Sequence, residues 1–112
     1  MFTVVVKDKF DAAHHLPGVP VCERIHGHTF QVEVSVSAKE LNDKGMVIDF
    51  RDIKTVTSGL YDHDDLNKFF DMPTAENLAK FMFYALKKNL CGQCIDYVRI
   101  WESSDAYAEY SE

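Results

Sequence analysis

The stretch from His28 to Ala38, "HTFQVEVSVSA", constrains the fold of this chain more than any other. Its apolar side chains occupy alternate positions, with polar residues between them: Phe30, Val32, Val34 and Val36. Because successive side chains of a strand point to opposite faces, this pattern predicts a half-buried antiparallel strand. Other elements must then cover its apolar face, and the rest of the chain is rich enough in apolar residues to supply them.

Five further segments complete the predicted fold. A first strand is expected from about Phe2 to Ala13, where β-branched and apolar residues predominate. A short helix is expected over 51–60 and a longer one over 73–92, with Thr74 as the N-cap of the longer helix. Two strands are expected within 95–103 and 106–112. The order β-β-α-α-β-β predicts one α+β domain over residues 1–112, with a four-stranded antiparallel sheet and two helices on one face.

Composition excludes several classes of protein. The 112 residues fit one domain, and a formal net charge of −6 disfavours a nucleic-acid binder, which needs a basic surface. No apolar run approaches the roughly 20 residues of a membrane span. The beginning of the sequence lacks the pattern of a secretory signal, so a cytoplasmic location is expected. Three cysteines, an odd number, argue against a complete disulfide framework.

Three histidines and one glutamate continue the apolar rows of the predicted strands. His26 and His28 have the same parity as Phe30, and His14 continues the even-numbered row of the first strand. Glu102 shares the parity of the buried positions in the strand that precedes it. Because side chains alternate with period two, we expect these four polar groups at the mouth of the core and not on the outer face of the sheet.

The histidines are candidate metal ligands. His26 and His28, two apart on an extended strand, project to the same side and can reach one ion, and His14 on the neighbouring strand is the natural third ligand. Three neutral imidazoles on Zn²⁺ leave the fourth position open, which is the pattern of a catalytic site. The alternative interpretation is that these are solvated or core histidines without a ligand role.

Other polar residues near these histidines allow both chemical and structural interpretations. Cys22, close to Arg24 and a metal, could act as a base or nucleophile, or it could be a small buried apolar residue. Asp62 beside His63 has the composition of a proton shuttle, and equally that of a polar loop.

The "CGQC" motif at residues 91–94 matches the spacing of a redox motif or half of a zinc knuckle. It follows a predicted helix C-terminus, where the dipole opposes a thiolate, and no second ligand pair is free. These cysteines are therefore interpreted as structural turn residues.

Six motifs occur in an order that resembles the 6-pyruvoyltetrahydropterin synthase and 6-carboxytetrahydropterin synthase family. They span Phe10 to Ser103 and read "FDAAHHLP", "CERIHGHTF", "VIDFRDIK", "YDHDDLN", "PTAENLA" and "IWES". The resemblance implies the tunnelling fold, in which subunits join their sheets into a barrel. It also implies a homo-oligomer, either a trimer or a dimer of trimers.

The resemblance further implies a role for each matching residue. His14, His26 and His28 would hold zinc, with the "AAH" alignment favouring His14 over His15. The remaining site residues follow by position: Cys22 as the catalytic thiol, Asp62 and His63 as proton-transfer partners, Glu102 as the pterin anchor and Thr74 near the pterin pocket.

The implied substrate is a small molecule, 7,8-dihydroneopterin triphosphate. The short spacing from Cys22 to His26 resembles the branch that forms 6-carboxytetrahydropterin on the route to 7-deazaguanine nucleosides such as queuosine. Glu23 directly follows Cys22, and folate-type members that form 6-hydroxymethyldihydropterin use a glutamate in this loop. A 6-pyruvoyltetrahydropterin synthase and a non-catalytic zinc- or pterin-binding protein remain alternatives.

Overall fold

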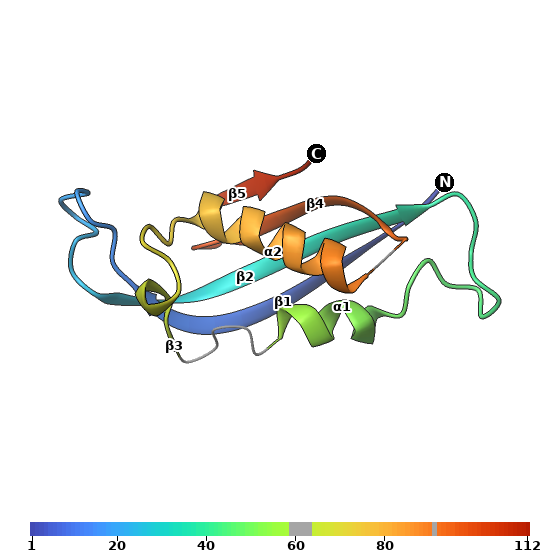
Figure 1. The fold of residues 1–112 in the computed structure, drawn as a ribbon, viewed down its shortest axis with the longest axis horizontal. Coiled ribbons are helices and arrows are strands. Elements are labelled where there is room, and N and C mark those ends of the chain that lie inside the picture. Colours follow the sequence, from blue (N-terminus) through green and yellow to red (C-terminus); the bar gives the residue numbers. More distant parts are fainter. Residues whose placement is uncertain (59–63, 91) are drawn as a thin grey trace.

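Two long strands form the centre of the molecule. The computed structural model describes residues 1–58, 64–90 and 92–112. In it, β1 (Phe2–His14) pairs antiparallel with β2 (His26–Ala38) over its whole length. On the other side of β2 lie β4 (Cys94–Trp101) and then β5 (Tyr107–Tyr110), both antiparallel to their neighbours. Figure 1 shows the β1–β2 loop projecting from the end of the sheet opposite the N-terminus.

The sheet has five strands in the described residues, one more than the sequence predicts. The additional strand, β3 (Asp64–Asp65), lies outside β1, so the order is β3-β1-β2-β4-β5. It runs parallel to β1, opposite Ala12 and Ala13. The prediction of a wholly antiparallel, four-stranded sheet is therefore corrected at this edge. Two residues are too few to produce a period-two pattern, which explains why the sequence does not reveal β3.

Both predicted helices are present, and both end earlier than expected. Helix α1 (Phe50–Thr57) begins at the N-cap Asp49, whose side chain accepts a hydrogen bond from the Arg51 N–H. Helix α2 (Ala75–Asn89) ends before Gly92. A short 3₁₀ helix, η1 (Leu66–Lys68), follows β3. Within the described part of the chain, none of the helices is long and apolar enough to cross a membrane.

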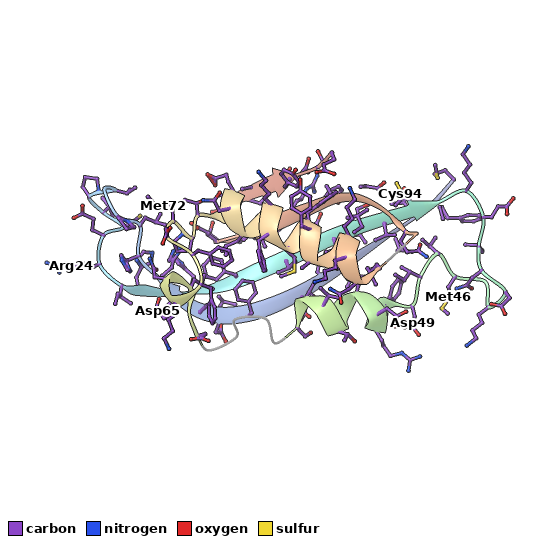
Figure 2. All side chains as sticks on the ribbon, viewed as in Figure 1. Arg24, Met46, Asp49, Asp65, Met72 and Cys94 are labelled. Atoms are coloured by element: carbon purple, nitrogen blue, oxygen red, sulfur yellow. The ribbon has the colours of Figure 1, made fainter. Side chains whose placement is uncertain are left out.

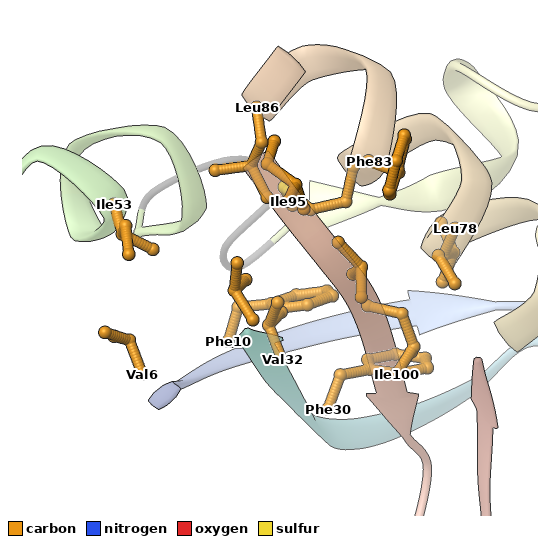
Figure 3. Close-up of a cluster of buried hydrophobic side chains, with 14 of the residues drawn as sticks. Val6, Phe10, Phe30, Val32, Ile53, Leu78, Phe83, Leu86, Ile95 and Ile100 are labelled. Atoms are coloured by element: carbon orange, nitrogen blue, oxygen red, sulfur yellow. The ribbon is translucent and has the colours of Figure 1, made fainter. Parts of the chain in front are cut away.

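The hydrophobic core lies between one face of the sheet and the two helices. Even-numbered side chains of β1 and β2 point into it, as the alternation predicts, and Ile53 of α1 and Leu86 of α2 are fully buried against them. Figure 3 shows these helix side chains above Phe10 and Val32 of the sheet. Burial of this apolar area supplies the main favourable term in folding.

The other face of β2 is more buried than a half-exposed strand requires. Glu33, at 4% exposure, accepts hydrogen bonds from Arg99 (2.9 Å) and Tyr97 (2.7 Å) on β4. Ser35 and Ser37 donate to the two carboxylate oxygens of Asp96, where the pairing register of β2 and β4 shifts. Long side chains of the flanking strands thus cover the polar row of the central strand, which period two alone does not predict.

The N-cap of α2 gives a testable contribution to stability. The Thr74 hydroxyl oxygen accepts a hydrogen bond from the Asn77 N–H at 3.1 Å, confirming the predicted capping role. Thr74→Ala leaves this N–H without its partner, and we expect a loss of about 1 kcal/mol in the free energy of unfolding. Denaturant titration measures this loss, with Thr74→Ser as the control that retains the cap. Equal stability of the alanine and serine variants would contradict the assignment.

A cluster of hydrogen bonds ties the segment after β5 to α2. The Glu112 carboxylate accepts hydrogen bonds from Tyr84 (2.5 Å), Lys87 (3.1 Å) and Tyr110 (2.9 Å). These three donors, led by Tyr84, lower the pKa of Glu112 from 4.5 to about 2. Between about pH 4.5 and pH 2, the Glu112 carboxylate therefore stays ionised in the folded chain, whereas the same carboxylate is mostly protonated in the unfolded chain.

This pKa shift predicts a pH-dependent effect of Glu112→Gln. Because the folded-state pKa is depressed, the carboxylate's stabilisation is fully present above about pH 4.5 and is lost as the pH falls toward 2. We expect the parent chain to melt at a higher temperature than the variant at pH 6, and the gap to close between pH 4.5 and 2. Thermal melts across that range measure the gap. A gap that stays constant with pH would show that the carboxylate charge contributes nothing.

Candidate functional site

Three histidine rings meet at one end of the sheet. His14 and His26 are directly opposite each other in the β1–β2 pairing, and His28 is opposite Ala12. Their ring centroids are 4.6 to 5.0 Å apart, and one nitrogen from each lies within 4.8 Å of the others. The His14 side chain is buried, and the other two are half-buried. The parity prediction is thus confirmed, and His14, not His15, belongs to this cluster.

Hydrogen bonds set the tautomers of two of these rings. His14 Nδ1 lies 2.9 Å from the Pro73 carbonyl oxygen, and His26 Nδ1 lies 2.7 Å from that of Arg24. A carbonyl oxygen can only accept, so Nδ1 carries the hydrogen in each ring. In the neutral imidazoles, Nε2 is therefore the atom with the free lone pair, as in a metal-ligating histidine whose other nitrogen is held by a backbone carbonyl.

The surroundings of His28 favour its neutral form. Burial, followed by the neighbouring rings of His14 and His26, lowers the pKa of His28 from its ordinary 6.5, against an opposing effect of the Glu102 carboxylate. A neutral ring has a lone pair available for a metal, whereas an imidazolium has none. The electrostatics of the cluster thus agree with a ligand role at neutral pH.

The donor set fits a zinc-type metal ion. His14 Nε2 is buried and has no hydrogen-bond partner among the described residues, a costly state that a metal bond would relieve. Tetrahedral zinc with bonds of about 2.0–2.1 Å holds its ligand atoms roughly 3.4 Å apart. The three nitrogens, all within 4.8 Å, need only small side-chain rotations to reach this geometry. His14, His26 and His28 could therefore hold a metal ion and leave a fourth position open.

Glu102 lies at the same end of the sheet as the histidines. It directly follows β4, whose Ile100 is opposite Val32 of β2, so Glu102 continues the buried row toward His28. Its carboxylate acts electrostatically on His28, and the side chain is half-buried. The expected position of this glutamate, on the row of buried positions at the end of the core, is confirmed, and its role toward a ligand stays a prediction.

A groove of about 590 Å³ is lined by residues 11–13 of β1, residues 27–29 of β2 and both residues of β3. Its lining includes His28 and three carboxylates, those of Asp11, Asp64 and Asp65. No lysine or arginine lines it in the described part of the chain, and the nearby Lys68 is 3.4 Å from Asp64. The groove itself thus offers no cation for a polyphosphate, so such a group must find its counter-charges elsewhere.

The loop from His15 to Ile25 carries Cys22 and Glu23. It folds back so that the Leu16 N–H donates to the Cys22 carbonyl oxygen at 2.6 Å, two residues beyond His14. Cys22 is half-buried and Glu23 is exposed. The cysteine backbone is thus tied to the end of β1 that carries the first histidine, while the thiol stays outside the group of three ligand nitrogens.

Two predicted residues, Asp62 and His63, lie outside the described part of the chain, and so does Cys91. Cys94 is exposed and begins β4. Figure 2 shows Cys94 toward the end of the sheet opposite Arg24, far from the histidine cluster. Cys94 is therefore not a member of the histidine site.

Sequence reasoning missed two residues that support the cluster. Pro73 supplies the carbonyl that orients His14, and the Asn67 side chain binds the backbone of His15. Each contact joins residues more than 50 positions apart. No local pattern in the sequence reports such pairings, although Asn67 lies in the "YDHDDLN" motif that also contains Asp62 and His63.

Comparison with solved structures identifies the class of protein. The structure of Caenorhabditis elegans 6-pyruvoyl tetrahydropterin synthase superimposes with a TM-score of 0.83 at 26% identity, covering 99% of this chain and 95% of that one. This likeness over nearly the whole of both chains assigns the α+β fold to the class of the tetrahydropterin synthases, as the tunnelling-fold prediction expects. Residues 3–112 also match the sequence profile described as 6-pyruvoyl tetrahydropterin synthase, and the chain belongs to that family.

Two curated relatives are similar over nearly the whole chain. The putative 6-carboxy-5,6,7,8-tetrahydropterin synthase of Archaeoglobus fulgidus is 37% identical over 107 residues, which cover 93% of this chain and 90% of that protein. The dihydroneopterin monophosphate aldolase of Pyrococcus furiosus is 37% identical over 106 residues, which cover 91% and 90%. The two enzymes have different names and the same identity to this chain, so the reaction must be inferred from the residues of the site.

Proposed function

We propose that this chain is a zinc-dependent lyase that converts 7,8-dihydroneopterin triphosphate to 6-carboxytetrahydropterin. The observation that carries the proposal is the cluster of His14, His26 and His28, with a buried, unpartnered Nε2 on His14. Two further observations support this branch of the family. The chain is similar to a putative 6-carboxy-5,6,7,8-tetrahydropterin synthase, and the spacing from Cys22 to His26 is short. The product would feed a 7-deazaguanine pathway of the queuosine type.

The zinc ligands would be Nε2 of His14, Nε2 of His26 and one ring nitrogen of His28. When bound there, zinc supplies Lewis-acid chemistry toward oxygens of the substrate side chain. The hydrogen bonds from His14 to Pro73 and from His26 to Arg24 hold these rings in the tautomer that the metal needs. The half-burial of His26 and His28 leaves one side of the cluster open to a small molecule.

The other residues would bind the pterin and move protons. Glu102 would anchor the pterin ring by accepting hydrogen bonds from its amino and ring N–H groups, with Thr74 and the start of α2 near the ring. The Cys22 thiolate would take a proton from the substrate side chain, and Asp62 with His63 would exchange another. Because the groove beside His28 is acidic, we place the triphosphate away from it, on cations that include those of a neighbouring subunit.

We further propose that the enzyme works in the cytoplasm as a homo-oligomer, a trimer or a dimer of trimers. Most of the outer edge of β1 and that of β5 have no partner strand in the described chain, so sheets of neighbouring copies can pair there. Pairing one edge of a chain with the other edge of the next copy is heterologous, and a rotation of one third of a turn per copy would close three chains into a ring.

Product identification tests the reaction. The purified, zinc-loaded protein is incubated with 7,8-dihydroneopterin triphosphate, and pterins and aldehydes are identified by mass spectrometry. We expect 6-carboxytetrahydropterin, acetaldehyde and triphosphate. Formation of 6-pyruvoyltetrahydropterin would assign the chain to the other synthase branch. Bound zinc without any product would leave a non-catalytic zinc- or pterin-binding protein.

A second candidate reaction is the folate-type formation of 6-hydroxymethyldihydropterin. Glu23 beside Cys22 favours it, and so does the similarity to an enzyme named dihydroneopterin monophosphate aldolase. A carboxylate in place of a thiolate would then serve as the base. The same incubation, repeated with 7,8-dihydroneopterin monophosphate, distinguishes the two, because only this reaction yields a hydroxymethyl pterin.

A further inference from the structure

The backbone of β1 loses its strand partners just where it carries the first histidine. Pairing with β2 ends at His14 opposite His26, and pairing with β3 ends at Ala13 opposite Asp65. His15, the next residue, lies beyond both ladders. A half-buried N–H and C=O at such a position need other partners, or they carry a desolvation cost.

One side-chain amide satisfies both groups of His15. The His15 N–H donates to Asn67 Oδ1 at 2.8 Å, and Asn67 Nδ2 donates to the His15 carbonyl oxygen at 3.0 Å. Together these give the His15 backbone the acceptor and the donor that two residues of an adjacent parallel strand would supply. The amide of Asn67 therefore extends the β1–β3 pairing by one more step, through a side chain.

Asn67 is itself held in place. Its own N–H donates to Asp65 Oδ1 at 3.0 Å at the start of η1, and its neighbour Leu66 is fully buried in the core. Asp65 in turn pairs with Ala13 on β1. The amide thus projects from a turn that is held in place by other contacts, so its two hydrogen bonds fix the position of the His15 backbone.

The constraint acts directly on the buried metal-ligand candidate. His14 lies between the Ala13–Asp65 pairing and the Asn67–His15 hydrogen bonds, so its backbone is fixed on both sides. Its ring is fixed separately by the hydrogen bond from Nδ1 to the Pro73 carbonyl. These anchors together determine where His14 Nε2 lies relative to His26 and His28.

We propose that Asn67 is a positioning residue of the metal centre, which holds the β1 backbone so that His14 Nε2 converges with the other two imidazoles. This rests on the proposed metal-binding function and extends it to a residue that touches neither the metal nor the substrate. Outer hydrogen-bond partners of metal ligands typically contribute 10- to 100-fold to metal affinity. Because Asn67 acts through the backbone, we expect a loss near the lower limit.

The test compares Asn67→Ala with Asn89→Ala as a matched control. Asn89 also donates one side-chain hydrogen bond to a backbone oxygen, that of Ala85 at 2.7 Å, but it ends α2 at the opposite end of the molecule. Two readouts are used: Zn²⁺ affinity by competition with a chromophoric chelator, and the visible absorption of the Co²⁺-substituted full-length chain. Thermal melts of the metal-free proteins report any general loss of stability.

We expect Asn67→Ala to lower Zn²⁺ affinity about 10-fold and to change the Co²⁺ spectrum, while Asn89→Ala leaves both as in the parent. Asn67→Asp, which keeps the Oδ1 acceptor for the His15 N–H and loses the Nδ2 donor, should lie between the parent and the alanine variant. If the alanine variant does not fold, the Asn67→Asp measurement is used in its place. Affinity within about twofold of the parent with an unchanged Co²⁺ spectrum would overturn the proposal. Failure of the parent itself to bind Zn²⁺ would instead overturn the proposed function.

Discussion

Removing the metal is expected to abolish turnover. Chelation should lower activity by roughly a thousandfold or more, because a bound metal contributes several kcal/mol of transition-state stabilisation. Zinc added back to the chelated parent should restore activity. His26→Ala should show the same loss of activity, and added zinc should not restore it, because the two remaining imidazoles are too few to form the three-ligand site. His26 is chosen because its ring is half-buried at a strand end, so its removal disturbs the core less than loss of buried His14.

Two measurements accompany the activity assay for this prediction. Zn²⁺ affinity of His26→Ala should fall by a larger factor than in any variant of a supporting residue, because a direct ligand is lost. The thermal melt of the metal-free variant should stay close to that of the metal-free parent. Full activity of the chelated parent, with metal analysis showing no residual zinc, would exclude a catalytic metal.

Loss of the Cys22 thiol should reduce the rate but not the metal content. If Cys22 moves a proton of the substrate, Cys22→Ala should lower kcat by about 10²- to 10⁴-fold, the usual contribution of a positioned acid or base. Because Cys22 is not part of the candidate ligand group found among the described residues, Zn²⁺ affinity should remain that of the parent. Steady-state kinetics and metal titration on the same preparation measure both quantities.

Cys94→Ala is the matched control for this experiment. Cys94 is exposed and lies at the far end of the sheet, so its loss should leave kcat and KM unchanged. Activity lost in both variants would point to a general thiol effect such as oxidation. Activity retained in Cys22→Ala would remove the thiol from the reaction and leave the carboxylate of Glu23 as the candidate base, in favour of the aldolase-type reaction.

Part of the site follows from local periodicity. Strand geometry places every second side chain on one face, so the parity of His14, His26, His28 and Glu102 with buried apolar neighbours is enough to bring them to the same side of the sheet. The N-cap of α2 at Thr74 is equally local, because the hydroxyl and the N–H that it accepts lie within one helical turn. Features of this kind involve residues close in sequence, and a pattern can report them.

The remaining features depend on contacts between distant segments. β3 pairs with β1 across about 50 residues and is too short to leave a pattern of its own. The burial of Glu33 depends on side chains of β4, more than 60 positions away. The orientation of His14 by Pro73 is of the same kind.

The sequence by itself therefore determined the α+β element order, the face on which the histidines lie and the motifs of a tetrahydropterin synthase. Only the tertiary structure decided how close the three imidazoles lie, which ring nitrogen of His14 and of His26 is free, and that Pro73 and Asn67 hold the ring and the backbone at His14. The physical reason is that side-chain periodicity is a property of one strand. Hydrogen bonds and the distances between ligand atoms depend on how separate strands and turns pack against each other.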